Sequence, residues 1–188
     1  MDISGYWATL VSIILGLGLA DVLVNFHRLL VERDRVRWDG LPLIWTLSVL
    51  LLLLNYWWAL ALNRDGAANA HTAGEFGLAA TVPILLFLVC ASVLPRRFPA
   101  EGMLDMRAGW ERQRTLFAAL FLLYMASNWI IAIMVYGGIA LDLQTVLRAI
   151  VSALVATLLF VRSRPWNWIV ALVVLASAVA RLAAQQVR

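Results

Sequence analysis

Six stretches of largely apolar residues follow one another along this chain, and they constrain its fold more than any other feature. A transmembrane α-helix needs about 20 such residues to cross about 30 Å of hydrocarbon. The chain has 188 residues, of which 63% are hydrophobic and 14% charged, so a soluble domain could not bury its apolar surface. The sequence therefore predicts an all-α, polytopic transmembrane helical bundle that forms a single domain over residues 1–188. The predicted spans are residues 5–30, 41–62, 76–94, 115–136, 143–161 and 166–184.

The distribution of arginine predicts how this bundle is oriented. All fifteen basic residues are Arg, and the absence of Lys suggests a high-GC bacterial genome. Eleven arginines lie at the foot of the first span or in the links after the first, third and fifth spans, against four on the opposite side. Positively charged links favour the cytoplasm. We therefore expect a multi-pass protein of the bacterial inner membrane with both termini on the non-cytoplasmic side.

The basic link at residues 96–114 is the longest of these links and has two interpretations. It contains Met103, Leu104, Met106 and Trp110 among charged residues. A short interfacial helix at about residues 103–113 would bury these four side chains at the acyl boundary and leave the arginines to the phosphates of membrane lipids. The alternative is an ordinary basic linker.

The first span carries small residues at helical spacing. Ser12, Gly16 and Ala20 recur every fourth residue, and Gly18 lies close to the same side. Small residues at this spacing let another helix backbone approach closely. We expect this set to pack against a helix, either of the same subunit or of a second one.

A polar group follows directly below. Asp21, Asn25 and Arg28 share one helical face, because offsets of four and seven residues return to the same side. An ionised carboxylate inside a membrane must find a partner, face water or take up a proton. Asp21 therefore either pairs with Arg28 or with an arginine of a neighbouring link, or it handles a proton or cation. Asn55 and Asn128 extend the candidate polar network onto the second and fourth spans.

Two further arginines, Arg148 and Arg181, lie near the ends of the fifth and sixth spans. Long basic side chains in this position usually extend to the lipid headgroups. If they face inward instead, they would form a vestibule that attracts anions and is lined with amides and Trp rings.

Several classes of function lack the residues that they need. The sequence has no Gly-rich phosphate loop after a strand, no His-x-x-x-His pair and no Ser/His/Asp set at a sensible depth. Cys90 is the only cysteine, which excludes an internal disulfide or a cysteine-based metal site. We therefore predict no enzyme activity, no cofactor, no metal and no nucleic-acid partner.

Four motifs carry a resemblance to a known group of proteins. They are LGLGLADVLVNFHRLL, NYWWAL, TVPILLFL and WERQRTLF, in this order along the chain. Together they resemble an uncharacterised family of small bacterial multi-span membrane proteins of unknown function. The resemblance implies a helical membrane bundle of about six spans and supplies no activity.

Two functions remain open at this point. The first is a small oligomeric channel or transporter-like protein for an ion or small solute, with Asp21 and Asn25 as the permeation or coupling groups. The alternative is a non-catalytic accessory or assembly subunit of a larger membrane complex, because few polar groups are available to line a pathway. The expected partners are membrane lipids and either further copies of the chain or a larger membrane complex.

Overall fold

A computed structural model gives the fold of the chain and describes residues 3–62, 73–96, 99, 102–135 and 143–184. The described residues form six α-helices, with a 3₁₀ turn (Arg33–Arg35) and two very short strands in the links. The helices are α1 (Ile3–Val31), α2 (Gly40–Leu62), α3 (Ala73–Val93), α4 (Met106–Val135), α5 (Leu143–Phe160) and α6 (Arg164–Ala184).

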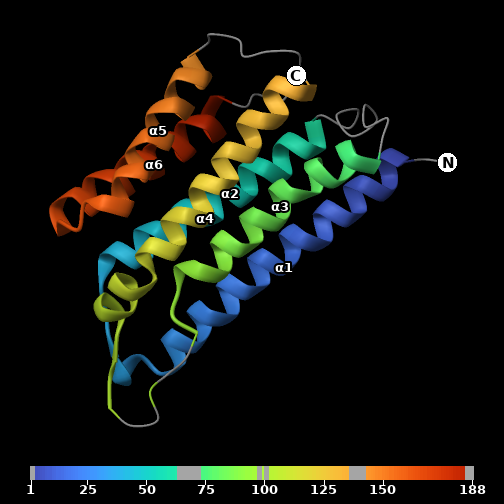
Figure 1. Cartoon of the computed structure of the whole chain (residues 1–188). Helices are drawn as coiled ribbons and strands as arrows, with labels where there is room; N and C mark the ends of the chain where they lie inside the picture. The colour runs from blue at the N-terminus through green and yellow to red at the C-terminus, as the bar shows by residue number, and fades with distance from the viewer. Residues whose placement is uncertain (1–2, 63–72, 97–98, 100–101, 136–142, 185–188) are drawn as a thin grey trace.

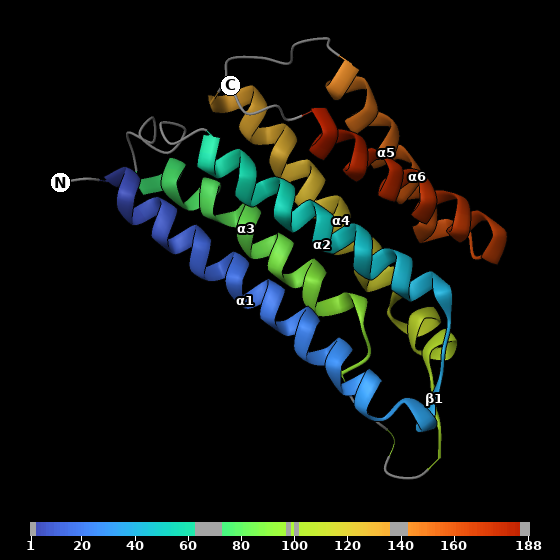
Figure 2. The ribbon, with the colours of Figure 1, turned by 180° about the vertical axis from the view of Figure 1, so that it is seen from behind.

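Successive helices alternate in direction, so α1 begins and α6 ends at the same end of the bundle (Figures 1 and 2). α3 lies between α1 and α4, and α2 packs across α1, α3 and α6. α5 and α6 form an antiparallel hairpin, in which α5 contacts α4 and α6 contacts α2. α1 and the hairpin therefore lie at opposite edges of the bundle.

Four of the helices are long and apolar enough to cross a membrane, namely α1, α2, α4 and α6. α3 and α5 contain shorter apolar stretches, Ala79–Val93 and Thr145–Phe160. The prediction of an all-helical membrane bundle is therefore supported at the level of four candidate spans.

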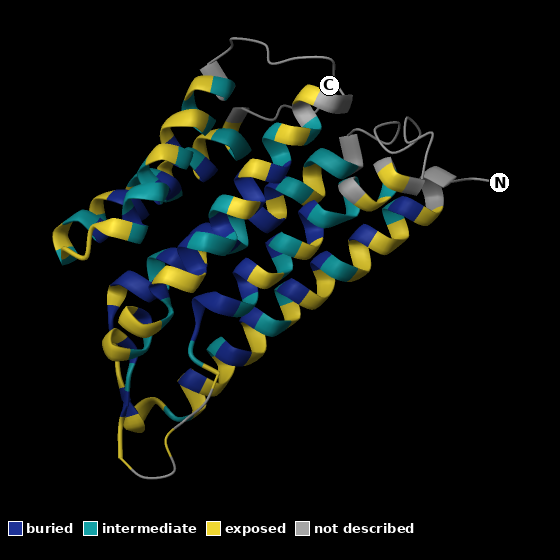
Figure 3. Ribbon diagram, viewed as in Figure 1, coloured by how far each residue is buried: buried dark blue, intermediate teal, exposed yellow. Residues whose placement is uncertain are grey.

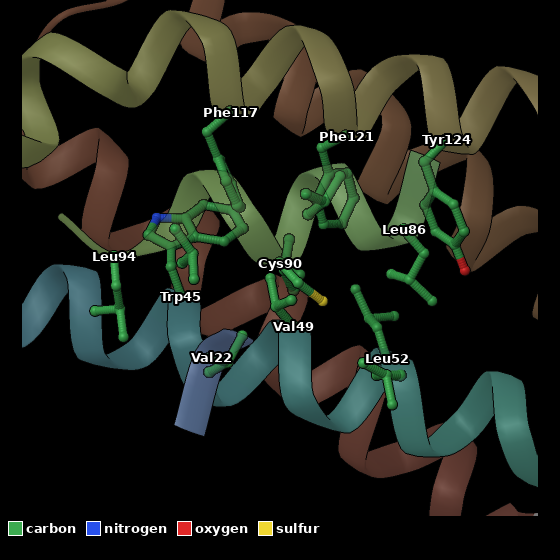
Figure 4. Close-up of a cluster of buried hydrophobic side chains, with 14 of the residues drawn as sticks. Val22, Trp45, Val49, Leu52, Leu86, Cys90, Leu94, Phe117, Phe121 and Tyr124 are labelled. Carbon is green, nitrogen blue, oxygen red and sulfur yellow. The ribbon is translucent and has the colours of Figure 1, made fainter. Parts of the chain in front are cut away.

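Large aromatic side chains fill the centre of the bundle. Trp45 of α2 is fully buried and stacks on Trp110 of α4, with ring centroids 5.9 Å apart. Phe117 and Phe121 project from α4 toward α2 and α3, and Tyr124 continues this row with its hydroxyl at the far edge (Figure 4). Exposed residues lie along the outer sides of the bundle, including the outer side of α1 (Figure 3). The middle of the bundle is consequently a closed apolar core.

The predicted spans agree with the observed helices within about three residues, except at the start of α4. Residues 106–113 form the first turns of α4, which begins at Met106 and continues to Val135. The interfacial position of residues 103–113 stays a prediction. Its 30 residues correspond to about 45 Å, which is longer than the hydrocarbon thickness. Met106 and Trp110 are buried by the protein itself, whereas Met103 is exposed.

A short parallel pairing ties together two links that are far apart in the sequence. Strand β1 (Val36–Arg37) pairs with β2 (Leu104–Asp105), and β1 is labelled in Figure 2. Asp105 then accepts hydrogen bonds from the backbone N–H groups of Arg107 and Ala108 at the start of α4. These bonds, that of Ala108 above all, hold the pKa of the Asp105 carboxyl below its usual value, and the nearby Arg37 and Arg107 act in the same direction. The α1–α2 and α3–α4 links therefore meet at one end of the molecule, which we call the basic end.

Candidate functional site

Asp21 is paired with an arginine from another helix end. Arg96, which follows Pro95 at the end of α3, places Nη2 at 3.1 Å from Asp21 Oδ1 and 3.2 Å from Oδ2. Asn25 donates from Nδ2 to Asp21 Oδ2 at 3.2 Å and to the Asp21 carbonyl oxygen at 2.8 Å. The carboxylate is thus held by one cation and one amide.

Arg28 joins the same group indirectly. Its Nη1 donates to the backbone oxygen of Arg96 at 3.4 Å, so it fixes the residue that pairs with Asp21. Asp21 and Arg28, which the helical spacing places on one face, therefore both contact Arg96, and Asn25 of the same face contacts Asp21. We call Asp21, Asn25, Arg28 and Arg96 the Asp21 cluster.

The pairing and exposure of this cluster favour a structural role, in which it connects two helices. The side chains of Asp21 and Arg96 are 26% and 50% exposed, so the pair lies at the surface of the bundle and not in its core. The arrangement fastens α1 to the end of α3, and of the two interpretations of Asp21 it supports pairing with an arginine of a neighbouring link.

Asn55 and Asn128 lie apart from this cluster. Asn55 of α2 donates to the carbonyl oxygens of Leu51, at 2.8 Å, and of Ala178 on α6, at 3.2 Å. Asn128 donates within α4 to the carbonyl oxygen of Tyr124 at 2.7 Å. In the described part of the chain no hydrogen bond connects either amide to Asp21, so the predicted network divides into separate groups.

The small residues of α1 also form two groups, one packed against other helices and one exposed. A Cβ atom added at Gly18 would lie 3.3 Å from Leu53 and 3.5 Å from the Cys90 sulfur, so Gly18 permits close packing of α1 on α2 and α3. Ser12, Gly16 and Ala20 are exposed, and an added Cβ at Gly16 would meet nothing within 4 Å. A shallow depression lies on the same side, lined by Ala8, Thr9, Ser12 and Ile13. We call Ser12, Gly16 and Ala20 the α1 outer face.

A second ion pair, between residues that were not predicted as site residues, connects the α5–α6 hairpin to the start of α2. Asp39 is almost completely buried, accepts a hydrogen bond from the Leu41 backbone N–H at 2.9 Å and pairs with Arg164 at 2.7 Å. Arg114 of α4 donates to the carbonyl oxygen of Val161 at 2.8 Å, just after the end of α5. The signal that could have identified Asp39 is its place before a helix start, since Asp is a preferred N-terminal cap.

Metal binding has no support in the described residues, where no three His, Cys, Asp or Glu side chains gather. Comparison with known proteins found no matching family model, curated protein or solved structure. The resemblance to small bacterial membrane proteins of unknown function therefore stays a prediction.

Proposed function

We propose that this protein is a non-catalytic membrane subunit that assembles through the α1 outer face, with a second copy of the same chain as the partner. The observation that carries this proposal is the exposure of Ser12, Gly16 and Ala20 at the edge of the bundle, with open space beside Gly16. In lipid, helices associate through small residues that let backbones approach. A second copy presents the same stripe, so a two-fold contact would be self-complementary.

The interior of one chain supports assembly over transport. The Asp21 carboxylate is occupied by Arg96. The middle of the bundle is closed by Trp45, Phe117 and Phe121, all fully buried. A hydrated pathway needs polar lining along its length, which the described core of a single subunit does not provide.

The decisive variant is Gly16→Leu, measured as the monomer–dimer equilibrium in lipid vesicles by subunit counting. We expect dimer dissociation to increase at least about tenfold, because the branched side chain separates the two backbones. Leu17→Ile is the matched control, since Leu17 is also exposed but is not part of the stripe. A Gly16→Leu protein that dimerises as the wild type does would refute the proposed interface.

A topology of six spans, with both chain ends outside the cytoplasm of a bacterial cell, also belongs to this proposal. α3 has 21 residues and α5 has 18, which correspond to about 32 Å and 27 Å of helix. The β1–β2 pairing and the Asp39–Arg164 ion pair bring three links to one end. This supports α3 and α5 as membrane crossings. The chain enters and leaves each of these two helices at opposite ends of the bundle, so each helix runs from one end to the other (Figures 1 and 2).

A second candidate function is passage of an ion or small solute through an oligomer, with Asp21 and Asn25 as coupling groups. It is favoured by the partial exposure of Asp21 and Arg96, which leaves the pair accessible from the surface. In proteoliposomes, Asp21→Asn should then abolish or alter the flux of an ion, whereas Asp34→Asn, which removes an almost fully exposed carboxylate, should not. Unchanged permeability across a broad panel of ions would exclude this function.

A further inference from the structure

Two arginines of the α5–α6 hairpin lie at the end of the bundle opposite the basic end. Arg148 of α5 places its guanidinium carbon 5.7 Å from the centroid of the Trp129 ring on α4. Arg181 lies in the last turn of α6 and is partly buried. Because α5 and α6 form an antiparallel hairpin, the first turns of α5 and the last turn of α6 lie at the same end of the bundle (Figures 1 and 2). The hairpin therefore brings two arginines to one end of the bundle, and one of them lies against α4.

The acids whose side chains the structure describes are paired with other arginines. Asp21, Glu32, Asp34, Asp39, Asp105 and Glu111 are the acids whose side chains the structure describes, and each lies in an ion pair with another arginine. Among the described residues, no acid pairs with Arg148 or Arg181. Cations beside an apolar core are costly, unless an anion neutralises them.

The surroundings of the two arginines are polar and fixed in position. Asn55 ties α2 to the Ala178 carbonyl, one turn before Arg181, and its Oδ1 is buried without a protein partner in the described part of the chain. Asn128 bonds to the carbonyl of Tyr124 on the α4 side. Arg148 rests on the Trp129 ring, which limits the directions that its guanidinium can take.

We propose that Arg148 and Arg181 together bind the phosphate group of an anionic ligand between α4, α5 and α6. Guanidinium groups match phosphate oxygens with paired, charge-assisted hydrogen bonds, which an ammonium group does not reproduce. The phosphate belongs either to a lipid headgroup or to a free anion. A lipid could extend its acyl chains along the exposed outer residues of the hairpin, such as Ile150 and Val179.

The test uses the full-length protein in detergent, titrated separately with short-chain phosphatidylglycerol and with inorganic phosphate. Binding is measured as the shift in thermal unfolding midpoint and by calorimetry. We expect Arg148→Gln and Arg181→Gln each to weaken binding about tenfold to a hundredfold, as expected for loss of a hydrogen bond to a charged group. Arg162→Gln is the matched control, because Arg162 is an exposed arginine in the α5–α6 turn at the other end.

The two probes separate the sources of the phosphate. Saturable binding of phosphatidylglycerol alone assigns the site to a lipid headgroup, and binding of inorganic phosphate, alone or with the lipid, assigns it to a free anion or to both. Binding that is unaffected by the two Gln variants, or that is lost in Arg162→Gln instead, overturns the proposal. Absence of binding of both probes also overturns it and would indicate that the chain neutralises these arginines itself.

A measurement on the wild-type chain covers the case in which a variant does not fold. Phenylglyoxal modifies accessible arginines, and peptide mass mapping reports which ones. The ligand that binds should protect Arg148 and Arg181 and leave the rate at Arg162 unchanged. Equal rates at Arg148 and Arg181 with and without both probes would contradict the site.

Discussion

At the scale of single residues, the partner of a charged side chain decides what that side chain contributes. Asp21 sits in an apolar helix, yet Arg96 and Asn25 satisfy its carboxylate. Both members of the ion pair are partly exposed. Its expected contribution to the free energy of unfolding is therefore modest, like that of other ion pairs at or near the surface.

Removing Asp21 should therefore destabilise the protein by about 1 kcal/mol. Unfolding by a denaturing detergent measures this for Asp21→Asn, Arg96→Gln and the double variant. The double variant should be little less stable than either single one, because both substitutions remove the same interaction. Asp34→Asn should have no measurable effect, since Asp34 is 95% exposed. Additive losses would show that the two residues act independently.

Asp105 gives a prediction about pH. The backbone N–H groups at the start of α4 lower its pKa in the folded state below the usual value of 3.8. The capping contribution should therefore be complete above about pH 4 and be lost as the pH falls through the lower, folded-state pKa. The thermal unfolding midpoints of wild type and Asp105→Ala should differ by a constant amount above pH 4 and converge in more acidic solution.

The matched variant for this experiment is Asp105→Asn. It keeps an oxygen acceptor for the Arg107 and Ala108 N–H groups but has no charge to titrate. Its midpoint should change with pH less than that of the wild type in the acidic range. A wild-type profile that matches the Asn profile would contradict the assignment.

At the scale of secondary-structure elements, the α5–α6 hairpin depends on contacts at its turn. The buried Asp39 carboxylate both caps α2 and pairs with Arg164 at the start of α6. Arg114 satisfies the Val161 carbonyl oxygen after α5. These two contacts connect the hairpin to α2 and α4 at the basic end.

Arg164→Gln should loosen the hairpin selectively. It leaves the Asp39 carboxylate buried without its cation, and we expect a loss of about 1 to 3 kcal/mol. Hydrogen exchange should become faster in the first turns of α6 and the last turns of α5, with little change in α1. Arg162→Gln is the control in the same turn. Uniformly faster exchange in all six helices would show that the pair stabilises the whole bundle instead.

At the scale of the whole molecule, the side of the membrane on which each link lies tests how many helices cross the membrane. If α3 crosses the membrane, Met103 lies on the same side as Asp34. If only α1, α2, α4 and α6 cross, Met103 lies on the opposite side. Met103 is 56% exposed and accessible to a reagent. Single cysteines are introduced at these positions in a Cys90→Ala background and labelled with an impermeant maleimide in intact bacterial cells.

We expect Asp34→Cys, Met103→Cys and Arg162→Cys to be protected in intact cells and labelled only after the cells are opened. Tyr6→Cys, at the other end of α1, should be labelled from outside. Labelling of Met103→Cys from outside would contradict six spans. If the first three positions were labelled from outside and Tyr6→Cys were protected, the six spans would stand and the orientation would be reversed.

The sequence by itself determined the helices, because the length of an apolar run and the residues that end it depend on local chemistry and on the thickness of a bilayer. It also showed that Asp21, Asn25 and Arg28 share a face, since that follows from the helical repeat. It did not reveal that residues 106–113 belong to α4, because a charged helical turn continues a span with no change of periodicity.

The tertiary structure decided which faces meet. Helical spacing groups residues but does not say which group turns inward. For this reason only packing could separate Gly18, which lies against Leu53, from Gly16, which lies open at the bundle edge. In the same way, the fold pairs Asp21 with Arg96, which is 75 residues away in the sequence. It also pairs Asp39 with Arg164, which is 125 residues away. Such pairs are set by the arrangement of helices in space, and no local pattern in one segment encodes them.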